Sequence, residues 1–87
     1  MVVNLSRRSV QWLEALSSAA GSEGWASAAQ VADALHRTTA GTMAATSSAA
    51  AANLRSLRSV GLVESRPWNF RREWRLTPSG WAFVVSD

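Results

Sequence analysis

The residues from Thr46 to Val85 constrain the fold of this chain more than any other stretch. They open with an alanine-, leucine- and arginine-rich pattern typical of a helix (TSSAAAANLRSLRSV), followed by a short exit (GLVES). An arginine-rich segment with aromatic residues (SRPWNFRREWRL) comes next, and a helix-starting sequence (TPSG) follows it. The pattern predicts a helix that leads directly into a two-stranded basic ribbon and then returns to a helix.

Length and composition limit the chain to one small domain. Its 87 residues leave no room for a second core, so we expect a single domain over residues 1–87. The absence of cysteine excludes disulfides and thiolate metal sites, and the single histidine, His36, argues against a zinc site. There is no catalytic motif, and Glu64 and Glu73 are better explained as salt-bridge partners of the ribbon arginines. We therefore expect no enzyme activity and no cofactor.

The N-terminal sequence (MVVNLSRRSVQW) has no long apolar run. We therefore expect neither a signal peptide nor a membrane span, and a cytoplasmic location.

Charge is distributed unevenly along the chain. The net charge is +3, with three arginines facing three acidic residues through Ala44 and six facing three from Ala45 onward. Local asymmetry of this kind marks a binding face better than the total does. The chain has no lysine, and arginine alone can fork onto a phosphate or a guanine edge. A lysine-free, alanine-rich composition is also typical of a GC-rich genome, and both explanations remain open.

A first helix is predicted from Ser6 to Ala20, because apolar residues recur there at helical spacing. The GSEG sequence breaks it, and the Trp-Ala pair that follows can form a very short strand. The next four residues, SAAQ, have the form of a capping box, which opens a second helix that buries Val31 and Leu35.

Residues 36–45 (HRTTAGTMAA) allow two interpretations, because the threonines and glycine indicate a loop while residues 43–45 can join the next helix. Thr46 can cap a third helix that runs to about Val60, and Gly61 then ends it as a left-handed cap. We expect the buried side of this helix to carry Ala50, Leu54 and Leu57.

The hairpin has strand candidates at 62–66 and 70–76, with a turn around 67–69. Two registers compete. A three-residue loop pairs Leu62 with Trp74 and Glu64 with Arg72, whereas a two-residue loop puts Glu64 opposite Glu73. Because facing opposite charges stabilise a sheet and like charges destabilise it, we favour the longer loop.

A short helix follows the hairpin. Thr77 can cap it, with Pro78 at the first helical position. This helix carries Trp81, Val84 and Val85.

The predicted order is helix, short strand, helix, helix, strand, strand, helix, which is mainly α (α+β). It is the winged helix-turn-helix arrangement: a three-helix core, a two-stranded β wing and a short C-terminal helix. GLVES, the arginine-bearing hairpin and RLTPSGWAFV closely resemble the wing and exit helix of bacterial MarR-type and PadR-type regulators. SAAQVADAL looks like the first helix of their helix-turn-helix. The resemblance spans roughly Ser27 to Val85 and is most specific over Val60–Gly80.

The resemblance implies a small transcriptional regulator that binds double-stranded DNA in a sequence-dependent manner. Helix 46–60 would then enter the major groove, and the 66–72 wing would lie on the backbone or in the minor groove. Two departures limit what carries over. The stretch between Leu35 and Thr46 is longer than the tight turn of those families. The chain also ends soon after the wing, where typical members continue into dimerisation helices or carry a ligand pocket, so we expect no small-molecule effector.

The third helix has few side chains that read bases. The side opposite its buried stripe carries Ser48, Ala52, Arg55 and Ser59. The helix N-terminus suits a phosphate, Arg55 suits a base edge, Ala51 or Ala52 a thymine methyl, and Arg58 the backbone. Alternatively, the four alanines 49–52 simply allow close helix packing. The candidate DNA-binding residues are Thr46, Ser47, Ser48, Ala52, Arg55, Arg58, Arg66, Asn69, Arg71 and Arg72.

The wing tip gathers arginines and aromatic residues around the turn. Its arginines can span phosphates or enter a narrow minor groove, and Trp68 or Phe70 can stack or wedge. In the other interpretation, both aromatic side chains fold onto the domain and only the arginines are solvated.

Five tryptophans in so short a chain need a place. We expect Trp25 and Trp74 in the core. If Trp12, Trp81 and Phe83 are exposed together, they form a patch that suits a homodimer. Alternatively, they pack on each other and complete a small core.

Two other functions compete with DNA-dependent regulation. One is a winged-helix adaptor that docks its tryptophan and arginine surface onto another protein. The other is a non-specific architectural DNA-binding protein of phage or plasmid type.

Overall fold

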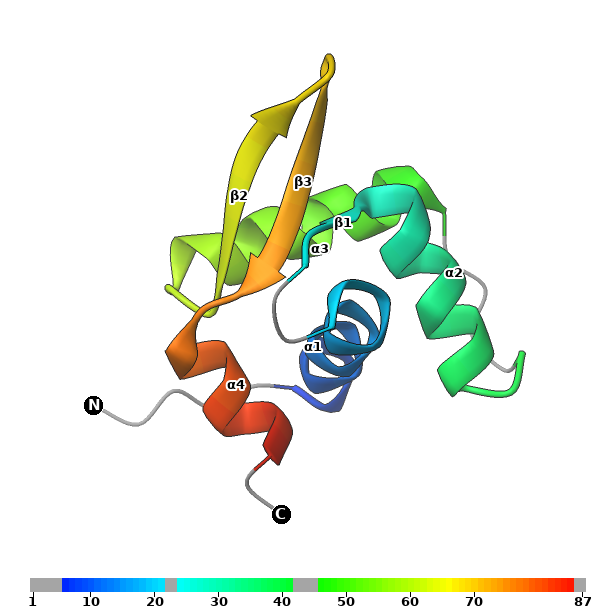
Figure 1. Cartoon of the computed structure of the whole chain (residues 1–87). Coiled ribbons are helices and arrows are strands. Elements are labelled where there is room, and N and C mark those ends of the chain that lie inside the picture. The colour runs from blue at the N-terminus through cyan, green and yellow to red at the C-terminus, as the bar shows by residue number, and fades with distance from the viewer. Residues whose placement is uncertain (1–5, 22–23, 42–45, 86–87) are drawn as a thin grey trace.

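The computed structural model describes residues 6–21, 24–41 and 46–85, and shows four helices around a small three-stranded sheet (Figure 1). The sheet is antiparallel with strand order β1-β3-β2, so that β3 lies in its centre. The elements in chain order are α1 (Arg7–Ala20), β1 (Ala26–Ser27), α2 (Ala28–Thr38), α3 (Ser47–Ser59), β2 (Val63–Trp68), β3 (Arg71–Leu76) and α4 (Pro78–Val85).

Side-chain caps stand at the starts of α1 and α3, where the sequence predicts that these helices begin. The Ser6 hydroxyl accepts a hydrogen bond from the Ser9 amide at 3.1 Å, and the Thr46 hydroxyl accepts one from the Ala49 amide at 3.1 Å. These bonds satisfy amide groups that have no partner within the first turn of a helix. The predicted starts of α1 and α3 are therefore confirmed.

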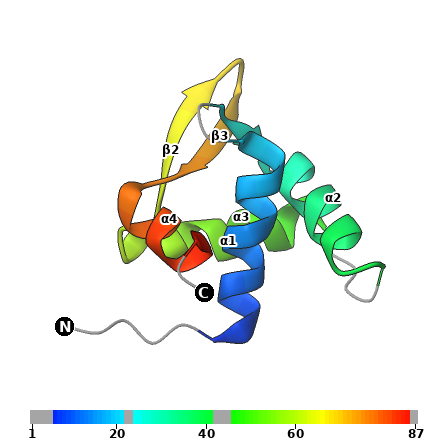
Figure 2. The same cartoon turned by 60° about the horizontal axis from the view of Figure 1, so that its bottom comes forward.

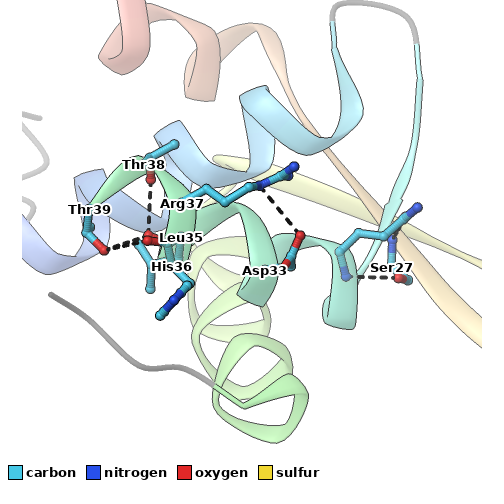
Figure 3. A network of polar contacts seen from close by, with 8 residues as sticks. Ser27, Asp33, Leu35, His36, Arg37, Thr38 and Thr39 are labelled. Atoms are coloured by element: carbon cyan, nitrogen blue, oxygen red, sulfur yellow. Dashed lines mark hydrogen bonds and ion pairs between the residues drawn. The ribbon is translucent and has the colours of Figure 1, made fainter. Parts of the chain in front are cut away.

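Helix α2 is closed at both ends by side chains (Figure 3). Ser27 and Gln30 form the predicted capping box, with the Gln30 side chain accepting from the Ser27 amide at 2.9 Å. At the other end, the hydroxyls of Thr38 and Thr39 donate to the Leu35 carbonyl at 3.3 and 2.7 Å. The helix buries Val31 and Leu35 as expected. The alternative that residues 43–45 join α3 concerns positions outside the described residues.

Helix α3 ends at the predicted glycine. Gly61 has φ 81°, its amide donates to the Arg58 carbonyl at 3.0 Å, and the Leu62 amide donates to the Leu57 carbonyl at 3.1 Å. This pair of bonds is the Schellman motif, whose left-handed residue is usually glycine. Because Leu57 and Leu62 are both buried beside it, the motif directs the chain from α3 into β2.

The observed hairpin register differs from both predicted registers. Pro67 and Trp68 belong to strand β2, and the turn consists of Asn69 and Phe70, with φ values of 50° and 65°. Pro67 is tolerated because β2 is the edge strand, where a missing amide need not interrupt a ladder. The turn has positive φ at both central residues, which matches the twist of a two-residue hairpin.

The observed register also places more pairs of opposite charges across from each other than either predicted register does. Glu64 faces Arg75, and Arg66 faces Glu73. The prediction that opposite charges face each other across the hairpin is therefore confirmed. The predicted turn around 67–69 is wrong, because the turn consists of Asn69 and Phe70. Both pairs form ion pairs, which confirms the expected role of the two glutamates.

The junction between the wing and α4 gives a structural role to the sequence LTPSG at residues 76–80. The Thr77 hydroxyl donates to the Gly61 carbonyl at 2.7 Å and accepts from the Gly80 amide at 3.2 Å. A Cβ on Gly80 would lie 2.0 Å from the Leu62 carbonyl oxygen, which is an impossible contact. The pattern therefore joins the base of the wing, the end of α3 and the start of α4 in one tight corner.

The core is apolar and lies between the helices and the inner side of the sheet. Trp12, Leu13 and Leu16 of α1 pack there with Leu54 of α3 and Trp74 of β3. Trp12 is 0% exposed, so its predicted place in an exposed dimer patch is wrong. It belongs to the buried residues of α1, together with Leu13 and Leu16, so its side chain helps to fill the core. Trp81 and Phe83 are partly buried against the same core, as the alternative proposed.

Figures 1 and 2 show the hairpin of β2 and β3 extending beyond the helices, with α3 crossing near its base. The helical order, the small sheet and the protruding hairpin form a winged helix-turn-helix fold, as predicted. Within the described residues, no helix has both the length and the apolar composition to cross a membrane.

Candidate nucleic-acid interface

A basic hollow of about 710 Å³ lies between α3, the start of α2 and the wing. We call it the arginine hollow. Four arginines contribute to its wall: two come from the outward side of α3 and two are the first residues of β3. The hollow is lined by Ser27, Ala28, Ala29, Ser47, Ala51, Arg55, Arg58, Arg71, Arg72 and Trp74.

The side of α3 that faces the hollow is rotated from the predicted one. Ser47, Ala51, Arg55 and Arg58 line the hollow, whereas Ser48 and Ala52 are exposed outside it. Arg58, predicted to contact the DNA backbone, also lines the hollow, and that contact stays a prediction. The hairpin stands over the end of α3 and brings its strands to the Arg58 side of the helix.

Arg58 and Arg72 meet at one oxygen atom. Nη1 of Arg58 donates to the Ser65 hydroxyl at 2.7 Å, and Nη1 of Arg72 donates to the same oxygen at 3.1 Å. The Arg58 guanidinium also lies over the Trp74 ring, 5.4 Å from its centroid. Ser65 and Trp74 face each other across β2 and β3, so the hairpin register places both beneath the guanidinium groups.

Arg55 lies further toward the start of α3. Its Nε atom donates to the Ala51 carbonyl at 3.3 Å, so the side chain lies back along the helix surface. The remaining guanidinium nitrogens extend from an exposed position. Contact between Arg55 and a base edge stays a prediction.

The opposite face of the wing is neutralised within the protein. Nε and Nη2 of Arg66 donate to Oε1 of Glu73 at 3.1 and 3.0 Å, and Arg75 forms an ion pair with Glu64. The guanidinium groups of Arg66 and Arg75 lie 4.4 and 4.3 Å from the centroid of the Trp25 ring. We call this surface the outer face of the wing.

The outer face bears on two expectations. Arg66 was predicted to contact DNA; its guanidinium is paired with Glu73, and the DNA contact stays a prediction. Trp25 was expected in the core, but it is only partly buried and instead supports two guanidinium groups. Cation–π contacts with an aromatic face favour this arrangement over full burial.

The wing tip is exposed. Phe70 is 107% exposed and Trp68 is 59% exposed, so the interpretation in which both fold onto the domain is wrong. Trp68 still has a partner, because Arg66 lies 5.3 Å from its ring centroid. Phe70 adopts a positive φ that a bulky residue rarely adopts, while Asn69 beside it tolerates that conformation.

The structure gathers some predicted residues and separates others. Ser47, Arg55, Arg58, Arg71 and Arg72 lie together at the hollow. Thr46 caps α3, and Asn69 forms the turn.

Sequence reasoning missed three contributors to this surface: the first turn of α2, Ser65 and Trp74. The capping box at Ser27 could have pointed to the first, because a helix N-terminus offers free amides to an anion. No local signal indicates Ser65, whose role depends on the hairpin register.

No group of three or more metal-ligating side chains occurs within residues 6–21, 24–41 and 46–85. The donors gathered at the hollow are guanidinium groups and hydroxyls, which suit an oxyanion and not a metal cation.

The chain is similar to the solved structure described as the complex of hsRosR-S4, with a TM-score of 0.75 and 22% sequence identity. The match covers 97% of this chain and 68% of that chain. At this level of identity the likeness concerns the fold, and it agrees with the winged helix-turn-helix arrangement described above. No family model and no curated protein matches the sequence.

Proposed function

We propose that this protein binds double-stranded DNA through the arginine hollow and acts as a small transcriptional regulator. Helix α3 would enter the major groove, with Arg55 at a base edge, and the wing would lie along the backbone or the adjacent minor groove. The observation that carries the proposal is the contrast in charge. The described contacts pair the arginines of the outer face with glutamates, and they give those of the hollow no carboxylate partner.

The shape of the surface supports the same conclusion. A protruding hairpin beside an exposed helix can follow a groove and its flanking backbone, and arginine forks match phosphate oxygens well. Because α3 offers few side chains for reading bases, we expect a large electrostatic share in the binding. Binding should then weaken steeply with salt.

The test compares two variants that remove the same charge. Arg71→Ala/Arg72→Ala removes two arginines from the hollow, whereas Arg7→Ala/Arg8→Ala removes two exposed arginines from the start of α1. We expect the wing variant to lose on the order of 100-fold in duplex affinity at low salt, and roughly two units of salt slope. The α1 variant should stay close to the parent.

Selection of bound fragments from a random duplex pool separates the candidate functions. Enrichment of a shared sequence supports a regulator, whereas tight binding without enrichment supports the architectural alternative. No duplex binding by the parent protein would exclude both and favour the adaptor.

We also propose a homodimer formed through α1 and α4, where Trp81 and Phe83 remain partly exposed. The burial of Trp12 reduces the apolar surface available to such a contact. Light scattering at micromolar concentration tests it, and a monomeric mass on duplex-bound and free protein would exclude it.

A further inference from the structure

Ser65 uses its hydroxyl in an unusual way. Its oxygen accepts hydrogen bonds from two guanidinium groups, Arg58 of α3 and Arg72 of β3. A hydroxyl has two lone pairs and one proton, so both lone pairs are engaged. None of the hydrogen bonds among the described residues uses the proton, which therefore remains available to an acceptor outside the protein.

This contact brings two positive charges together without a negative one. A neutral hydroxyl orients both guanidinium groups but does not offset their repulsion. The glutamates adjacent to Ser65 and across the hairpin, Glu64 and Glu73, lie on the outer face and are paired there. The charge at the hollow is thus left for a ligand to balance.

The Arg58 guanidinium is held by Trp74 as well as by Ser65. Its guanidinium lies over the ring of Trp74, which is only 2% exposed and therefore part of the rigid core. A hydrogen bond and a stacking contact together limit the rotamers of a long side chain. Less conformational entropy is then lost when a ligand binds.

We propose that Arg58, Arg72 and Ser65 form a single oxyanion site in the arginine hollow, which takes one phosphodiester of a DNA duplex. Ser65 acts as the positioning residue, and its free proton adds a third donor. The two non-bridging oxygens of a phosphodiester offer enough lone pairs for both guanidinium groups and for the hydroxyl. The inference rests on the proposed function and names a phosphate contact within it.

The first experiment changes Ser65 and leaves every charge in place. Ser65→Ala removes the shared hydroxyl, Ser65→Thr retains it, and Ser59→Ala serves as the matched control. Ser59 is exposed on α3, and its hydroxyl donates only to the Ser56 carbonyl among the described contacts. We expect Ser65→Ala to lose about threefold to tenfold in duplex affinity, with Ser65→Thr and Ser59→Ala near the parent.

A double-mutant cycle tests whether the two arginines share one ligand. Arg58→Ala and Arg72→Ala should each lower affinity and reduce the salt slope by roughly one unit. If both hold one phosphodiester, the second substitution should have a smaller effect once the first is present. Ser65→Ala should likewise have little effect in either arginine variant.

Inorganic phosphate distinguishes a general anion site from a duplex site. Its titration is followed through the NMR signals of the Arg58 and Arg72 side chains, in the parent and in Ser65→Ala. Phosphate-dependent shifts that Ser65→Ala weakens, together with its loss of duplex affinity, support the proposal. The same shifts without a loss of duplex affinity would assign the site to free phosphate and overturn the duplex part.

Two further outcomes separate the proposals. If the parent binds duplex but Ser65→Ala binds as tightly and the arginine effects simply add, the shared site is overturned while the proposed function stands. If the parent binds no duplex, the proposed function fails, and the shared oxyanion site is then judged by the phosphate titration alone. Thermal unfolding of each variant confirms that it is folded.

Discussion

On the outer face of the wing, Arg66 and Arg75 each form an ion pair with a glutamate, whereas on the inner face Arg72 shares a serine hydroxyl with Arg58 of α3. Both faces place guanidinium groups over a tryptophan ring. Both faces therefore combine arginine with tryptophan, but only the outer face has glutamates that pair with its arginines. A count of arginines along the hairpin overstates the charge available to DNA, because half of the strand arginines on the wing are already neutralised by the strand opposite.

The largest expected effect is a loss of stability from a substitution at the base of the wing, which supports both of its faces. Gly80→Ala would place a Cβ against the Leu62 carbonyl at the base of the wing. We expect a loss of about 3 kcal/mol in the free energy of unfolding, because the backbone there cannot yield without moving α4. Thermal or denaturant unfolding measures it, with Ser79→Ala, an exposed neighbour, as the control. Equal stability of the two variants would show that the corner is not rigid.

A smaller effect should separate the two faces. Arg66→Ala/Arg75→Ala removes the same charge as Arg71→Ala/Arg72→Ala but from the outer face. We expect its duplex affinity to stay within about threefold of the parent, because these charges are paired. Its stability should fall by about 1 kcal/mol, since cation–π contacts are lost and solvent screens the half-exposed ion pairs.

Filter binding across several salt concentrations tests this comparison directly. Equal losses of affinity in the two double variants would break it, and would mean that total charge decides binding.

The smallest expected effect lies at the tip between the faces. Phe70→Gly relieves a positive φ that costs about 1–2 kcal/mol in a bulky residue, and the flexibility of glycine offsets about half of this. We therefore expect the free energy of unfolding to rise by about 0.5–1 kcal/mol. If Phe70 stacks or wedges on DNA, duplex affinity should fall about fivefold in the same variant.

Phe70→Asn is the companion variant, because asparagine tolerates the same backbone conformation and also removes the ring. Greater stability with unchanged duplex binding in both variants would restrict DNA contact at the wing to its arginines.

Much of the fold was predictable because its signals act over a few residues. The capping residues Ser6, Ser27 and Thr46 each satisfy an amide three positions away, and Gly61 ends α3 through bonds that span one turn. Helical periodicity likewise identified the buried residues of α3. Each of these features depends on the backbone conformation of one short segment, which a local pattern can encode.

The candidate site was less predictable, because its contacts join separate segments. The hairpin register moved the turn to Asn69 and Phe70, and this shift decided which arginines face a glutamate. Two-residue turns with positive φ usually contain glycine, so Phe70 gave no signal for one. Trp25 also could not be assigned, since its partners lie some 40 to 50 positions further along the chain.

The sequence by itself determined the order of the elements, their capped ends and the apolar faces that form the core. The tertiary structure alone decided how the arginines are divided between a neutralised outer face and a basic hollow. The physical reason is the distance along the chain between the residues that interact. Caps and periodicity follow from bonds within one turn, whereas the partner of a guanidinium group depends on strand register and on how α3 packs beneath the wing. The meeting of Arg58 and Arg72 at Ser65 is the clearest example.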